Sequence, residues 1–125
     1  MVISCVIGCI GVWTCGRSVV RPGMDFGPPN FPAVIDSPMK CTWFILGPAG
    51  KMVIEFLFVD LANSTCTPTG NCIAVQQTYG RDDIHSSSQI QRISVDRSSA
   101  IVYMFIPDVP PGFRGFHARV IMSKD

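Results

Sequence analysis

Apolar residues recur at every second position along most of this sequence, which is the periodicity of a β-strand and not of an α-helix. In the clearest run, Met52, Ile54, Phe56 and Phe58 share one face of the expected strand. Comparable runs predict strands over residues 42–46, 52–59, 73–76, 90–95, 100–106 and 116–122. Turn-forming residues separate these runs, and no segment has a convincing helical pattern. The sequence therefore predicts an all-β fold, an antiparallel β-sandwich.

The same alternation predicts which side chains fill the space between the two sheets. We expect one large apolar residue at every second position of each strand to be buried. The predicted core consists of Trp43, Ile45, Ile54, Phe56, Phe58, Ile73, Val75, Ile101, Tyr103, Phe105 and Phe116.

Composition narrows the class of protein further. A chain of 125 residues with 47% hydrophobic residues is long and apolar enough for one domain with its own core. Six cysteines, 11 glycines and 10 prolines indicate a loop-rich domain held by disulfides in an oxidising compartment. Only 15% of the residues are charged, and a net charge of +1 argues against nucleic-acid binding through a basic face.

The N-terminal segment is apolar and carries no charged side chain before Arg17. It is too short for a membrane span of about 20 residues. We expect a signal peptide over residues 1–11, cleaved after Gly11, and a domain over residues 12–125. Because a basic stretch is missing, an incomplete leader and a buried first strand are the alternatives. Cleavage would leave four cysteines, enough for two disulfides.

Five short motifs, in order, resemble those of the CUB domain family. They are Cys15-Gly16, the G-P-P-N-F-P turn at 27–32, the C-T-W-F-I strand at 41–45, the P-A-G loop with its alternating strand at 48–61, and F-I-P-D with G-F-R-G-F at 105–116. The resemblance covers residues 15–120. It implies a CUB-like jelly-roll sandwich, secreted or extracellular, that binds a protein or glycoprotein and catalyses nothing.

The resemblance also implies a disulfide between Cys15 and Cys41. The family's second pair usually has a later cysteine some twenty residues downstream, but no cysteine follows Cys72. Cys66 and Cys72 flank a turn-forming stretch, so we expect a local bridge between them. Asn63 begins an Asn-Ser-Thr acceptor for N-glycosylation, which we expect to be occupied if the chain is secreted.

Many CUB domains bind calcium, and the resemblance places three ligand positions at Ala62, Asn71 and Asp108. Only one of the three is a carboxylate, whereas calcium takes several oxygen ligands. Asp60 lies two residues before Ala62 and would replace it only after a register shift. We therefore expect no bound cofactor and no functional calcium site.

Catalytic interpretations are weaker. His85 lies among Asp82, Asp83 and residues 86–88, which are serines, but a Ser/His/Asp triad is a spatial arrangement that adjacency along a polar loop does not build. A solvated loop is the better interpretation. The sequence contains no zinc-protease motif and no C-x-x-C pair. A direct hydrolase is thus the least favoured function.

Arg114, His117 and Arg119 lie near two phenylalanines and suggest a basic, aromatic patch for nucleic acid or an anionic glycan. Alternation gives a simpler interpretation. It places Phe116, Ala118 and Val120 inward, with His117 and Arg119 outward, as in any half-exposed strand.

We expect partner recognition in the loops at 67–71, 81–85 and 108–114, because sandwich loops vary without disturbing the core. The candidate contact residues are Arg81, Asp82, Asp83, Asp108 and Arg114. The alternative is that these charges only keep the domain soluble. A second hypothesis is that the chain is a fragment or isoform of a larger secreted protease or receptor, in which this module positions the enzyme or its ligand.

Overall fold

The computed structural model describes residues 13–29, 31–35, 38–61, 71–107 and 113–123. Within these ranges the elements are β-strands: β1 (Trp13–Val20), β2 (Asp25–Phe26), β3 (Met39–Leu46), β4 (Met52–Asp60), β5 (Cys72–Gln77), β6 (Gly80–Asp83), β7 (Gln91–Val95), β8 (Ser99–Ile106) and β9 (Gly115–Met122). The described part of the chain has no helix long and apolar enough to cross a membrane.

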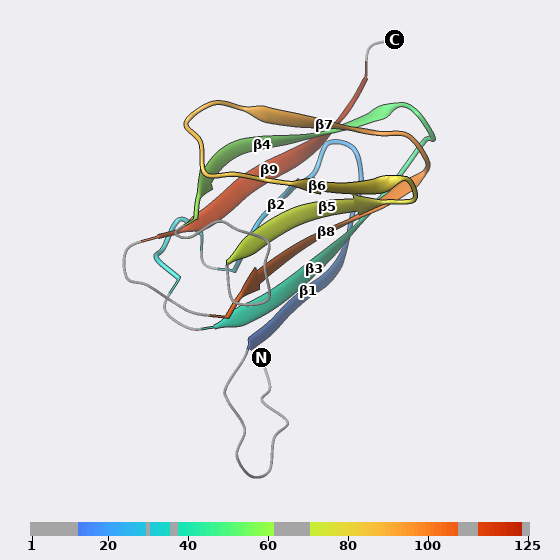
Figure 1. Ribbon diagram of the computed structural model, residues 1–125. Helices are drawn as coiled ribbons and strands as arrows, with labels where there is room; N and C mark the ends of the chain where they lie inside the picture. The colour runs from blue at the N-terminus through green and yellow to red at the C-terminus, as the bar shows by residue number, and fades with distance from the viewer. Residues whose placement is uncertain (1–12, 30, 36–37, 62–70, 108–112, 124–125) are drawn as a thin grey trace, which may run out of the picture.

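The strands form two sheets that pack face to face (Figure 1). One sheet has the order β1-β3-β8-β5-β6 and the other has the order β2-β9-β4-β7. Neighbouring strands are antiparallel except β1 and β3, which are parallel. The predicted all-β sandwich is confirmed, and β8 is the central strand of the larger sheet.

The six predicted strands correspond to β3, β4, β5, β7, β8 and β9. The sequence analysis missed β1, β2 and β6. In β1 the pairing register shifts between Gly16 and Ser18, so its pattern is interrupted. β2 has only two residues, and β6 is exposed along its whole length and carries no apolar residue. None of these three has the apolar alternation that identifies a strand.

Aromatic rings form the centre of the core between the sheets. Phe116 contacts the Trp43 ring at 5.2 Å and the Phe56 ring at 5.5 Å between centroids. Phe26 from the short β2 adds a fourth ring, 5.6 Å from Trp43. All four side chains are buried. Tilted and edge-on pairs at these distances are the favoured arrangements for aromatic rings.

The core prediction was right for residues of β3, β5 and β9 and wrong for β8. The buried residues of β8 are Ala100, Val102, Met104 and Ile106. Ile101, Tyr103 and Phe105 were predicted to be buried but lie on the outer face, where Ile101 is 39% exposed. β8 is apolar at nearly every position, so alternation does not distinguish its inner side from its outer side.

Phe58 is a second correction to the core prediction. The register between β4 and β9 shifts between Phe56 and Phe58, and Phe58 is only half-buried. A bulge of this kind breaks the strict alternation of side chains. The Phe58 ring instead packs against Phe31, at 5.7 Å between centroids.

A disulfide joins Cys15 on β1 to Cys41 on β3, the pair that the sequence resemblance implied. The two residues are paired in the strand register, with their Cα atoms 4.5 Å apart. Cys72 is also disulfide-bonded, to a partner outside the described residues. Cys66, Asn63 and the expected signal peptide also lie outside them.

Candidate functional site

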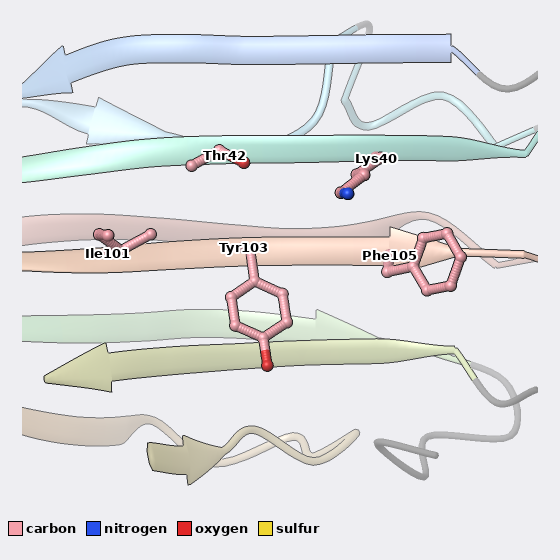
Figure 2. Close-up of a pocket in the computed structure, with 5 residues that line it drawn as sticks. All are labelled: Lys40, Thr42, Ile101, Tyr103 and Phe105. Atoms are coloured by element: carbon pink, nitrogen blue, oxygen red, sulfur yellow. The ribbon is translucent and has the colours of Figure 1, made fainter. Parts of the chain in front are cut away.

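The outer surface of the five-stranded sheet has a shallow hollow of about 390 Å³. Its lining comes from two adjacent strands, with Lys40 and Thr42 on β3 and Ile101, Tyr103 and Phe105 on β8 (Figure 2). We call the surface formed by these five residues the β8 face. Lys40 pairs with Phe105 and Thr42 pairs with Tyr103, so the two side chains of each pair lie next to each other on the same face of the sheet.

These side chains point outward because their chain neighbours fill the core. Cys41 and Trp43 on β3, and Val102 and Met104 on β8, are buried. Successive side chains of a strand point to opposite faces of the sheet. A sandwich needs an apolar surface only on the inner face of each sheet, and solvent-facing strands are usually polar there. The apolar residues on the outside of β8 are therefore unusual.

Tyr103 extends from β8 across β5 (Figure 2). Its pair partner on β5, Ala74, is fully buried although that position belongs to the outer face. Arg81 on β6 donates a hydrogen bond from Nη1 to the Tyr103 hydroxyl at 3.1 Å, and its Nε lies 3.0 Å from Asp83 Oδ1. The hydrogen bond to Tyr103 is the main cause that raises the pKa of Arg81. Arg81 and Asp83 thus form the rim of the β8 face beyond β5.

The residues predicted to bind a partner are not gathered in one loop. Arg81, Asp82 and Asp83 are exposed as expected but lie on the edge strand β6, so the loop expected at 81–85 is wrong for these three residues. Arg114 is exposed just before β9, where its backbone N–H donates to Asp60 Oδ2 at 3.1 Å. β6 begins where β5 ends, whereas β9 begins at the opposite end of the sandwich (Figure 1). Asp108 lies outside the described residues.

The positions implied for calcium are described only in part. Ala62 and Asp108 lie outside the described residues, while Asp60 is half-buried and Asn71 is buried. Asp60 and Asn71 supply one carboxylate between them, and that carboxylate accepts the backbone N–H of Arg114. Within the described ranges, no three His, Cys, Asp or Glu residues are grouped as metal ligands. Asp60 and Asn71 alone do not match the six to eight oxygens that calcium takes.

Two residues of the polar segment after β6, His85 and Ser86, form hydrogen bonds with neighbouring parts of the chain. The Ser86 hydroxyl donates to the Val59 carbonyl at 3.2 Å and accepts the Leu61 N–H at 3.0 Å. The backbone N–H and carbonyl of His85 both bond to the Gln91 side chain, at 3.2 and 2.6 Å. These contacts fasten the segment to β4 and β7, and the His85 side chain is exposed.

The outer surface of the four-stranded sheet carries a group that the sequence analysis missed. Glu55 on β4 is buried between Arg92 on β7 and Arg119 on β9, which donate from Nε at 2.7 and 2.8 Å. The hydrogen bonds from Arg119 and then Arg92 hold the pKa of Glu55 below its usual value, against the effect of burial. Only the strand register reveals this group, because it pairs Glu55 with both arginines.

The predicted orientation of β9 is confirmed. Phe116, Ala118 and Val120 are fully buried, while Arg119 is exposed and His117 is half-exposed. His117 Nε2 lies 3.1 Å from Asp25 Oδ2, and the His117 ring stacks on Phe31. Arg114 precedes β9, and its backbone N–H bonds to Asp60 on β4. Arg119 instead donates to Glu55, so the described contacts of these three residues go to three different carboxylates.

No family model matches the chain. Part of it is similar to procollagen C-endopeptidase enhancer 2 from Mus musculus, with 40% identity over 53 residues, which are 42% of this chain and 13% of the relative. The Homo sapiens protein of that name is 41% identical over 51 residues, 40% of this chain and 12% of the relative. The chain thus spans only a small part of the relatives it matches.

Solved structures match most of the chain. The CUB1-EGF-CUB2 domains of rat MASP-1 superimpose with a TM-score of 0.70 and 15% identity, covering 85% of this chain and 42% of that one. The MASP-1 CUB2 domain bound to Ca²⁺ gives a TM-score of 0.65 at 15% identity, covering 86% of this chain and 99% of that one. The fold predicted from the sequence motifs is therefore confirmed, and the chain has the fold of a CUB domain.

Proposed function

We propose that this chain is an extracellular, non-catalytic module of the CUB type that binds another protein or a glycan carried by one. The observation that carries the proposal is the β8 face, an open hollow with Ile101, Tyr103 and Phe105 as its floor. Contiguous exposed apolar surface is a common feature of interaction sites.

The rim of the β8 face supports the same role. Tyrosine and arginine are enriched among the residues that dominate the energy of protein interfaces. Tyr103 and Arg81 are already joined by a hydrogen bond, so little side-chain freedom is lost when a partner covers them. Arg81, proposed from the sequence as a contact residue, thus belongs to this surface together with Asp83.

The loop between β4 and β5 and the loop between β8 and β9 are a second proposed contact area. Arg114 is the proposed contact residue of this area that lies among the described residues. Asp82 on β6 and Asp108 are the remaining proposed contact residues. We also propose secretion after removal of residues 1–11, glycosylation of Asn63, and no bound cofactor. The partial relatives are named as enhancers of an endopeptidase, which fits a module that acts through another protein.

A second candidate function follows from the length of those relatives. The chain matches a segment that is only 13% of the mouse protein. In a larger secreted protease or receptor, the module would position the enzyme or its ligand instead of acting alone. Immunoblotting of the secreted product with an antibody against this domain tests this second function. A larger protease or receptor requires a band much larger than the 13.6 kDa chain.

Affinity capture tests the proposed function. Immobilised wild-type protein and a Tyr103→Glu variant are exposed to the same native extracellular fluid, and retained proteins are identified by mass spectrometry. We expect proteins that bind the wild type and are lost from the variant, while both proteins keep the same melting temperature. Arg81→Ala and Arg114→Ala then compare the two contact areas, and a loss of about 1 kcal/mol or more marks a dominant residue.

Two results would contradict the proposed function. Identical protein sets on the wild type and on both arginine variants would leave neither area with a binding role. Turnover of a hydrolase substrate panel by the purified domain would restore the enzymatic alternative.

A further inference from the structure

We propose that the β8 face binds a protein segment that presents a carboxylate beside an aromatic or aliphatic side chain, an inference that rests on the binding role proposed above. The β8 face combines an apolar floor with one cation, Lys40, that has no counterion among the residues the structure describes. The apolar floor favours an apolar side chain of the partner, and the cation favours a carboxylate.

The floor favours an apolar side chain of the partner. Ile101 is 39% exposed, and Tyr103 and Phe105 are half-buried beside it. A side chain placed in the hollow would remove further apolar area from water, at roughly 25 cal/mol per Å². The hollow is open to solvent on the outer surface of the sheet, so it fits a protruding side chain of another protein.

Lys40 provides the charge requirement. It is exposed on β3 next to Phe105, and it forms no ion pair with any of the described residues. On the far rim, the charge of Arg81 is balanced by Asp83 at 3.0 Å. Asp82 pairs with the buried Val75, so it belongs to the other side of the sheet. The β8 face therefore has one unbalanced positive charge, which a partner carboxylate complements.

The same charge argues against a second copy of the chain as the occupant. In a symmetric dimer the same patch meets itself, so both faces would contribute Lys40 and the same balanced rim. Two faces with an excess positive charge repel each other, and like charges across an interface oppose association. A partner that presents a carboxylate to Lys40 avoids this repulsion.

A displayed peptide library tests the proposal with the whole chain. Random peptides are selected on immobilised wild-type protein after depletion on Tyr103→Glu. We expect the selected peptides to carry Asp or Glu within two positions of a large apolar residue. The Kd of a synthetic selected peptide should rise about tenfold in Lys40→Glu, the loss expected for one ion pair at a partly desolvated contact.

Two controls separate the charge from other effects. Lys51→Glu makes the same charge change at an exposed lysine before β4, outside the β8 face, and should leave the Kd unchanged. Replacing the peptide's acidic residue with lysine should restore binding to Lys40→Glu and weaken binding to the wild type. Equal melting temperatures for all variants show that each remains folded.

Each other outcome overturns the inference. If the selected peptides are not enriched in acidic residues, or if Lys40→Glu and wild type have an equal Kd, the inference that the partner presents a carboxylate is wrong. The proposed binding function would remain intact. A library that yields no peptide dependent on Tyr103 would remove the face as a peptide site. A wild-type dimer in sedimentation that becomes monomeric in Tyr103→Glu would make a second copy the occupant.

Discussion

Glu55 shows how one residue organises the surface of the four-stranded sheet. Among the charged side chains whose burial the structure describes, it is the buried one, with a side chain 4% exposed. Burying a carboxylate is unfavourable unless it is paired and hydrogen-bonded. Arg92 and Arg119 satisfy both of its oxygens and cover it from two strands. Glu55 therefore links β7, β4 and β9 through side chains as well as backbone.

We predict that Glu55→Gln lowers the free energy of unfolding by about 1–2 kcal/mol, since two charge-assisted hydrogen bonds weaken. The loss is smaller than for a fully buried ion pair, because Arg92 and Arg119 are 61% and 46% exposed. Urea unfolding measures the change. Asp82→Asn on the exposed strand β6 is the matched control and should stay within about 0.5 kcal/mol of the wild type.

The effect of Glu55 should also depend on pH. Its pKa in the folded protein lies below the usual 4.5, so its contribution is fully present above pH 4.5 and is lost as the pH falls through the folded value. The stability difference between the wild type and Glu55→Gln should therefore shrink in acid. Unfolding curves between pH 7 and pH 3 test this, and a constant or growing difference would contradict it.

At the scale of single elements, β8 shows where sequence reasoning succeeds and where it stops. In β3 and β5 the alternation identified Trp43, Ile45, Ile73 and Val75 correctly as core residues. β8 is apolar on both sides, so its position was predictable but the face that points inward was not. The outer residues of β8 are the floor of the candidate site. The site was hidden because its residues were assigned to the core.

The orientation of β8 makes a direct prediction. Met104→Ala should lower the free energy of unfolding by about 2–5 kcal/mol, because Met104 is fully buried and its loss leaves a cavity. Ile101→Ala, three strand positions earlier and on the outer face, should cost about 1 kcal/mol or less. Chemical denaturation compares the two variants. A larger loss for Ile101→Ala would mean that the faces of β8 are assigned the wrong way round.

The disulfide between β1 and β3 secures the parallel edge of the larger sheet. It closes a separation of 26 residues, and constraint of the unfolded chain by a loop of that size stabilises the fold by roughly 3.5 kcal/mol. The double variant Cys15→Ala, Cys41→Ala should lose a stability of that order in urea unfolding. A non-reducing peptide map should contain the Cys15–Cys41 and Cys66–Cys72 peptides, and a Cys15–Cys66 peptide would contradict this pairing.

At the scale of the whole molecule, the chain combines the fold of a CUB domain with few residues suited to calcium. The fold was predictable because five motifs occur in family order over the domain. The arrangement of charges was not, because it depends on strand register, as the split between Arg81 and Arg114 shows. Recognition through the outer face of a sheet would make binding independent of a metal.

We predict that millimolar calcium leaves the melting temperature nearly unchanged. A ligand stabilises the folded state by RT ln(1 + [L]/Kd), so a weakly bound ligand adds little stability. A site with few carboxylates binds calcium weakly. Scanning calorimetry with calcium and with a chelator measures this. A rise of several degrees that the chelator reverses and Asp60→Ala abolishes would show a functional calcium site.

The most direct test of the central claim, that the β8 face is the binding surface, is hydroxyl-radical footprinting of the protein with and without its captured partner. Oxidation of Ile101, Tyr103 and Phe105 should fall in the complex. Tyr79, 72% exposed in the turn after β5, and Phe31, which packs against Phe58 and His117 of the other sheet, should react at the same rate in both states. Unchanged oxidation of Tyr103 together with protection of Phe31 would contradict the claim.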